Sequence, residues 1–172
     1  MADLGRGVKA GIVAGIIMGL LVGIITAALM MTVFHDEYAA MYQAAAEQAI
    51  AESGEEMPFD AEEFTDMMMT FGVVGILIIS PIIGVVIGVI FGLIYAALYD
   101  KLPGKTPIVK GLVIGMAYFV ISIMLSAVSS AIFASDMEID ATVQGVDYII
   151  SLLTSLIFGY LLGMFWVRFE PK

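Results

Sequence analysis

The chain has 172 residues, of which 61% are hydrophobic and 14% are charged, and its mean hydropathy is +1.03. Soluble domains carry about 45–50% apolar and about 25% charged residues, so this composition excludes an ordinary soluble protein. The net charge of −10 argues against nucleic acid as a partner, since phosphate binding needs positive charge, and the lack of cysteine excludes disulfides and thiolate metal sites.

Four segments of the chain are long and apolar enough to cross a membrane as helices. A helical span needs about 20 mainly apolar residues, whereas barrel strands have about 10 residues of alternating polarity. We expect spans at about 10–34, 72–99, 109–133 and 147–167. The first is too long for the apolar core of a cleaved secretory signal, which has about 7–15 residues. The sequence predicts an all-α integral membrane protein, with residues 1–172 forming one membrane domain: a four-transmembrane-helix bundle of two helical hairpins.

The placement of the basic residues predicts the orientation of the chain. They lie before the first span, between the second and third spans, or at the end of the fourth: Arg6, Lys9, Lys101, Lys105, Lys110, Arg168 and Lys172. Short loops rich in Lys and Arg stay in the cytoplasm. We therefore expect a multi-pass protein of the cell membrane, with both termini cytoplasmic.

An acidic segment, residues 36–70, separates the first two spans and keeps helical periodicity. Tyr38, Met41 and Tyr42 share one helical face, and turn-forming residues follow at 54–58. We expect the first span to continue outward as a helix and the chain to return as a helix into the second span, giving an extracytoplasmic helical hairpin. Its acidic charge either keeps an outer surface soluble or attracts cations or a basic partner, and both interpretations stay open.

Small residues recur every fourth position along the spans and so form one stripe on each helix. The glycines of these stripes are Gly11, Gly15, Gly19, Gly23, Gly84, Gly88, Gly92, Gly111, Gly115, Gly159 and Gly163. In a membrane, helix association depends on close van der Waals contact, which such stripes permit. We predict that these glycines pack helix against helix, either within the bundle or against another subunit.

The two hairpins also resemble each other weakly. Val8-Lys9, followed by Gly11, resembles Val109-Lys110-Gly111, and Ile90-Phe91-Gly92 resembles Ile157-Phe158-Gly159. Both hairpins begin on the same side of the membrane, so a duplication would be a parallel repeat, a symmetry that transporters use. Apolar sequence of low complexity also produces such matches by chance, which leaves the origin open.

Candidate metal ligands are few. Asp136, Glu138 and Asp140 have the spacing of a calcium loop, but Ala141 replaces the glycine that the turn needs, so they form a weak cation site at most. Methionines near the outer end of the first span are soft ligands for Cu(I), yet methionine fills packing gaps more often. His35 lies alone at the membrane edge. We expect no cofactor, with loose cation binding at the acidic outer face as an alternative.

No predicted span carries an ionisable residue in its middle, and no hydrolase or metalloprotease motif is present, so we expect no enzyme. Our leading hypothesis is a non-catalytic structural, assembly or accessory subunit that contacts the lipid bilayer and either its own copies or another membrane protein. The alternative is a transporter or channel with an acidic vestibule and a neutral pathway. Hydroxyl groups would line that pathway: Ser122, Ser126, Ser130, Ser151, Thr154 and Ser155.

Overall fold

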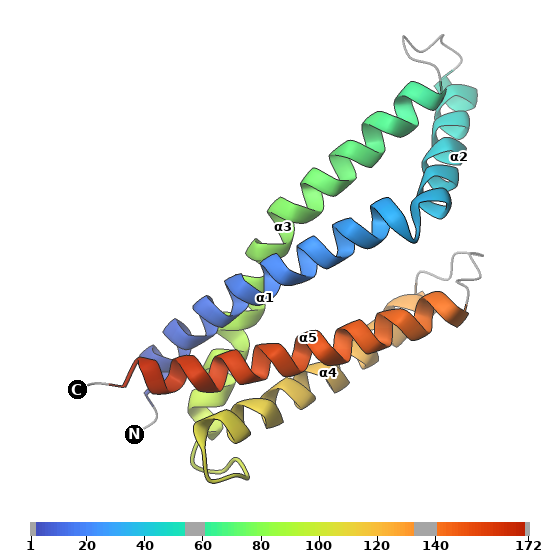
Figure 1. The fold of residues 1–172 in the computed structure, drawn as a ribbon. Coiled ribbons are helices and arrows are strands. Elements are labelled where there is room, and N and C mark those ends of the chain that lie inside the picture. Colours follow the sequence, from blue (N-terminus) through green and yellow to red (C-terminus); the bar gives the residue numbers. More distant parts are fainter. Residues whose placement is uncertain (1–2, 54–60, 133–140, 171–172) are drawn as a thin grey trace. The chain divides into compact units, whose positions relative to one another are not determined.

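The computed structural model describes residues 3–53, 61–132 and 141–170, and all regular structure within these ranges is helical (Figure 1). The helices are α1 (Leu4–Thr32), α2 (His35–Ser53), α3 (Ala61–Leu98), α4 (Pro107–Ile132) and α5 (Ala141–Arg168). Four of them, all except α2, are long and apolar enough to cross a membrane. The predicted class, an all-α membrane protein with four spans, is confirmed.

The chain divides into two compact units. Unit 1 comprises Met1–Gly19 and Ile82–Lys172, and unit 2 comprises Leu20–Pro81. The helices α1 and α3 each contribute one part to each unit, whereas α4 and α5 belong to unit 1 and α2 belongs to unit 2.

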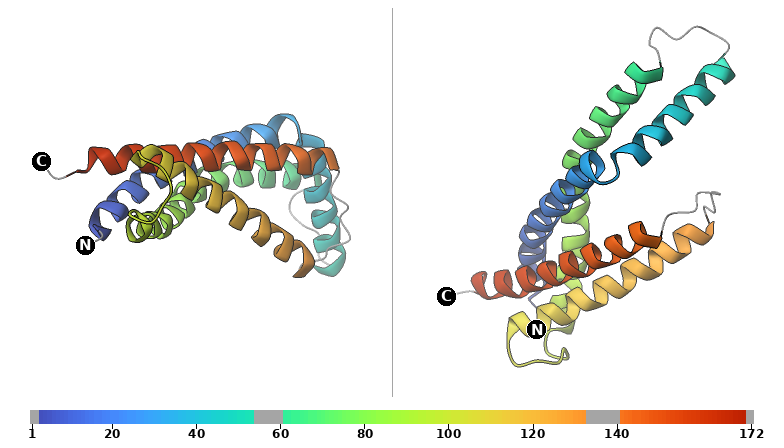
Figure 2. Two further views of the ribbon diagram at one scale, coloured as in Figure 1. Left: turned by 90° about the horizontal axis from the view of Figure 1, so that it is seen from below. Right: turned by 45° about the vertical axis from the view of Figure 1, so that its right-hand side comes forward.

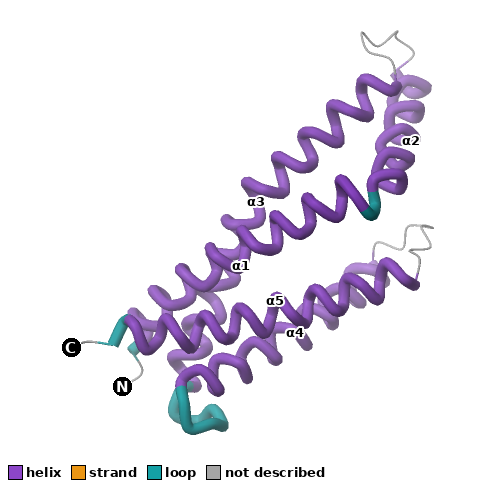
Figure 3. Tube along the Cα trace, in the orientation of Figure 1, coloured by secondary structure: helices purple, strands orange, loops and turns teal. Residues whose placement is uncertain are grey.

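The sequence predicts that the first span continues outward as one helix. In unit 2 the structure instead has a separate helix, α2, after the end of α1. Figure 3 shows a short break between α1, which ends at Thr32, and α2. The amides of Val33 and Phe34 both donate to the carbonyl of Leu29 at 2.9 Å. Residues 32–34 are β-branched or aromatic and so have weak helix propensity, which favours a break there. The amide of Tyr38 then donates to the carbonyl of Phe34 at 3.0 Å and starts α2.

The returning arm of unit 2 is the first part of α3, which packs near the end of α1 and near α2 (Figure 2). A methyl group added at Gly72 would lie 3.0 Å from both the Met30 methyl and the Tyr42 hydroxyl. Met30 is only 2% exposed, so a small residue at 72 makes room for its side chain. The predicted turn at 54–58 lies outside the described residues.

The helix α3 runs through Pro81 without interruption. Proline removes one amide donor and leaves the carbonyl one turn earlier, that of Leu77, without its helical partner. The Ser80 hydroxyl donates to the carbonyl of Ile76 and not to the freed carbonyl of Leu77.

Unit 1 contains the start of α1, the end of α3, and the antiparallel pair α4 and α5 (Figure 1). The loop between α3 and α4 turns at Gly104, whose φ of 116° lies in the left-handed region that favours glycine. Asp3 accepts a bond from the Arg6 amide at 2.9 Å and caps α1, while Thr106 accepts one from the Val109 amide at 3.3 Å at the start of α4. Both caps lie at the same end of unit 1 as this loop.

Candidate functional site

The first contact region of unit 1 joins α1 to α3 through facing glycines. Gly7, Gly11 and Gly15 of α1 lie against Gly92, Gly88 and Gly84 of α3, in that order. A methyl group added at any of them would fall on the backbone carbonyl of the glycine that faces it. The two backbones therefore touch directly, at a spacing that permits Cα–H to carbonyl contacts and that no side chain larger than hydrogen allows.

The second contact region joins α4 to α5 in the same manner. Gly111 lies against Gly159 and Gly163, and Gly115 lies against the Ser155 carbonyl and Gly159. Of the remaining predicted packing glycines, Gly19 lies beside Gly84 in unit 1, with its Cα 3.0 Å from a Cβ built at Gly84. In unit 2, Gly23 faces the Ser80 side chain. A methyl group added at Gly23 would lie 2.9 Å from the Ser80 hydroxyl oxygen. Every predicted packing glycine thus lies at a helix–helix contact.

The hydroxyl groups of the predicted pathway differ in how far they are buried. Thr154 is buried and donates to the carbonyls of Ile150 at 2.8 Å and Ser151 at 3.2 Å, and Ser122 donates to its own helix at Phe119, also at 2.8 Å. Ser155 is buried and Ser151 is half-buried, but Ser126 is exposed. The side chain of Ser130 lies outside the described residues. Where partners are resolved, these hydroxyls bond carbonyls of their own helices.

The structure offers no compact metal centre among the residues it describes. Asp136, Glu138 and Asp140 fall in the range 133–140, outside that description. Elsewhere in the described ranges, no group of three or more His, Cys, Asp or Glu side chains is placed to hold a metal ion. Unit 2 contains no Lys or Arg, and its acids near the end of α1, such as Asp36, are exposed.

A cluster of cations and aromatic rings lies at the basic end of unit 1, and sequence analysis missed it. The Arg6 guanidinium lies 4.4 Å from the centroid of the Trp166 ring, and its Nε donates to the Trp166 carbonyl at 2.5 Å. The same guanidinium lies 3.6 Å from the Glu170 carboxylate. Trp166 is buried, and the contacts of Arg6 with it hold the end of α5 against the start of α1.

Lys110 makes the corresponding contacts with Tyr99. Its Nζ lies 4.0 Å from the centroid of the Tyr99 ring and donates to the Tyr99 carbonyl at 2.6 Å. The Tyr99 ring in turn stacks on Trp166, with centroids 4.7 Å apart, and Tyr95 meets Trp166 edge-on at 5.1 Å. The Tyr95 hydroxyl donates to the Pro107 carbonyl at 2.6 Å. The cluster therefore links all four helices that contribute to unit 1.

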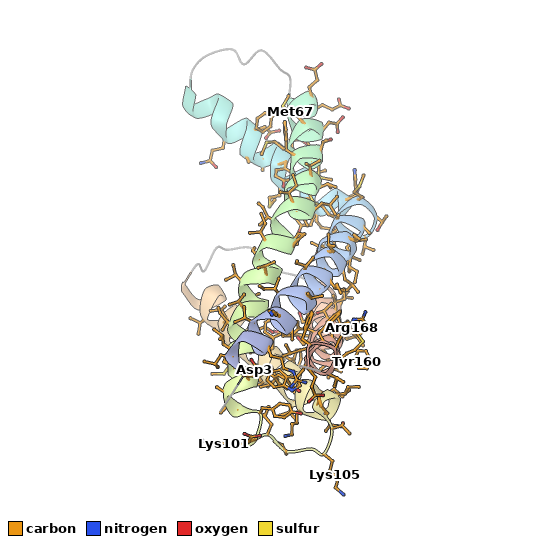
Figure 4. All side chains as sticks on the ribbon, turned by 90° about the vertical axis from the view of Figure 1, so that its left-hand side faces the viewer. Asp3, Met67, Lys101, Lys105, Tyr160 and Arg168 are labelled. Atoms are coloured by element: carbon orange, nitrogen blue, oxygen red, sulfur yellow. The ribbon has the colours of Figure 1, made fainter. Side chains whose placement is uncertain are left out.

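Two signals in the sequence point to this cluster. Trp and Tyr gather at membrane–water boundaries, and Tyr99 and Trp166 both stand where a span ends beside basic residues. Figure 4 shows Lys101 and Lys105 on the loop at one end of unit 1. Composition alone does not say which cation meets which ring.

The family model for CbtA, "Probable cobalt transporter subunit (CbtA)", matches residues 3–128. The chain belongs to the CbtA family. The match covers α1, α2, α3 and most of α4, and hence both arms of the first glycine contact region. This CbtA chain is accordingly a multi-pass membrane protein of a transporter-subunit family, which agrees with the expectation of a membrane subunit with a protein partner. No match was found among curated proteins or among solved structures.

Proposed function

We propose that this chain is a non-catalytic membrane subunit of a cobalt transporter, in which it forms part of the assembly and does not supply the whole passage by itself. The family match over residues 3–128 is the observation that carries the proposal. The orientation proposed is that of the charge pattern, with the basic end of unit 1 in the cytoplasm and the acidic segment 36–70 outside.

The spans themselves support an accessory role. A bare divalent cation in hydrocarbon needs charged or strongly polar ligands, yet the middle of each span lacks Asp, Glu, His, Lys and Arg. The resolved hydroxyl bonds of Ser122 and Thr154 go to their own helices, so these groups are already engaged. Ligands for the passage of cobalt would then come from a partner subunit, with the acidic segment 36–70 raising the local cation concentration outside.

The partner requirement can be tested in the organism that carries the gene. Tagged full-length chain, extracted from its own membranes in a gentle detergent, should purify with a second membrane protein, and deleting the gene should lower uptake of radioactive cobalt. Restoring the gene should restore uptake. Purification of the chain without any partner, together with unchanged uptake in the deletion strain, would refute the proposal.

Substitution of the hydroxyls separates this role from that of a pathway through the chain itself. Ser122→Ala and Thr154→Val remove hydroxyls that bond carbonyls of their own helices, and bonds of this kind add little to helix stability. Cobalt uptake should stay near the wild-type level at equal amounts of protein in the membrane. A severe loss of uptake with normal assembly would favour a hydroxyl-lined pathway.

A further inference from the structure

The two helical hairpins of unit 1 have the same construction. The first hairpin is the start of α1 (residues 4–19) with the end of α3 (residues 82–98), and the second is α4 with α5. In each, one glycine of the leading helix packs on two small residues a turn apart: Gly7 on Gly92 and Ala96 in the first, and Gly111 on Gly159 and Gly163 in the second. The next pair follows in step, since Gly11 packs on Gly88 and Gly92, and Gly115 packs on Ser155 and Gly159.

This correspondence pairs aromatic residues that touch each other. When Gly92 is matched to Gly159, Phe91 corresponds to Phe158 and Tyr99 corresponds to Trp166. The Phe91 and Phe158 centroids are 6.2 Å apart, and Tyr99 stacks on Trp166 at 4.7 Å. Equivalent residues of two copies meet in this way when they lie beside a two-fold axis.

The cations follow the same rule. Matching Gly7 to Gly111 makes Arg6 correspond to Lys110. Arg6 of the first hairpin lies over Trp166 of the second, and Lys110 of the second lies over Tyr99 of the first. Each cation also donates to the backbone carbonyl of the residue whose ring it covers, at 2.5 and 2.6 Å. Each hairpin therefore gives the other one cation, and the two cations make the same ring contact and the same backbone hydrogen bond.

We infer that unit 1 is one hairpin present twice, and that Arg6 and Lys110 are equivalent positioning residues that lock the two copies together at their basic ends. The weak repeat seen in the sequence is thereby assigned a register, with Arg6 and not Lys9 as the counterpart of Lys110. The role of this lock, the contacts of Arg6 with Trp166 and of Lys110 with Tyr99, rests on the proposed function. In transporters built from repeats, one repeat moves as a rigid body against the other. The lock would then be the joint of this movement, because it holds the two hairpins together at their basic ends.

The lock is tested first by the thermal stability of the purified full-length protein. Arg6→Gln and Lys110→Gln should each lower the apparent Tm by about 2–4 °C, since each removes one cation–aromatic contact in a protein of this size. Lys9→Gln and Lys105→Gln remove the same charge from exposed positions at the same end and should leave the Tm unchanged. Arg6→Lys and Lys110→Arg should keep the wild-type Tm, because each variant places at one position the cation that the equivalent position already carries. The equivalence is wrong if Arg6→Gln behaves like Lys9→Gln, if only one of the two sites matters, or if Arg6→Lys is as damaging as Arg6→Gln.

Cobalt uptake by the same variants then tests the joint separately from the transport function. Arg6→Gln and Lys110→Gln should lower uptake at equal membrane levels, with rescue by the cation-exchanged variants. If the wild-type protein supports no cobalt uptake, the proposed function fails while the melting data still decide the lock. If the glutamine variants melt early but transport normally, the lock is purely structural and the joint is refuted.

Discussion

The Phe91 and Phe158 rings meet nearly at right angles, with centroids 6.2 Å apart and planes inclined at 84°, although one belongs to α3 and the other to α5. Tyr118 of α4 completes the group at 5.0 Å from Phe91 and 5.7 Å from Phe158. Edge-to-face contacts of this kind add about 0.5–1.5 kcal/mol beyond the area that they bury. Three helices of unit 1 therefore share one aromatic core, a short distance inside the basic end.

Removal of this core should destabilise the protein strongly. Phe158 is fully buried, so Phe158→Ala should cost about 3–5 kcal/mol, the usual range for a buried Phe→Ala change. Phe71, which is 64% exposed, provides the matched control, and Phe71→Ala should have little effect. Thermal unfolding of both variants in the same detergent measures the difference. Equal melting temperatures would contradict the packing described for unit 1.

The glycine contact between α1 and α3 predicts that alanine substitution has different effects at different glycines. Gly11→Ala places a methyl group on the Gly88 carbonyl, which forces the helices apart and should cost about 1–3 kcal/mol, more than the gain of up to about 1 kcal/mol in helix propensity. A methyl group at Gly75 meets nothing within 4 Å, so Gly75→Ala should be neutral or slightly stabilising. The apparent Tm should thus fall for Gly11→Ala and stay the same or rise slightly for Gly75→Ala. A stabilised Gly11→Ala variant would rule out backbone contact at that position.

The hydroxyl of Tyr95 ties α3 to the start of α4. Tyr95→Phe keeps the ring against Trp166 but leaves the Pro107 carbonyl without its donor, at a cost of about 0.5–1.5 kcal/mol. Tyr160 is 46% exposed, and Tyr160→Phe serves as the control, with no expected change in Tm. Stability measured in the same detergent distinguishes the two. If both variants unfold alike, the Tyr95 bond contributes nothing measurable.

The orientation can be checked directly, because the chain has no cysteine of its own. Lys105→Cys introduces a thiol on the loop between α3 and α4, and Glu37→Cys introduces one at the start of α2; both positions are exposed. A maleimide that does not cross membranes should label Cys at 37 in intact cells, whereas Cys at 105 should react only after the cells are opened. The reverse pattern would overturn the proposed placement of the acidic segment 36–70 outside.

Local composition was enough to predict several features. Uncharged segments of span length predict membrane helices wherever they occur, because hydrocarbon cannot solvate charges or an open backbone. The small-residue rows likewise marked the positions, from Gly11 to Gly163, where helices now meet. The return of the chain as a helix from the acidic segment into the second span followed from the helical periodicity of that segment.

The pairing of those helices was decided only by the tertiary structure. Each span is apolar on all sides and carries a small-residue stripe, so its sequence does not say which other stripe will pack against it. The contact of Gly11 with Gly88 and the exchange of Arg6 and Lys110 between hairpins join residues far apart in the chain. Such contacts depend on how two backbones fit together in space, and neither partner's neighbours in sequence record that fit. This is also why sequence matching chose Lys9 as the counterpart of Lys110, whereas three-dimensional packing identifies Arg6.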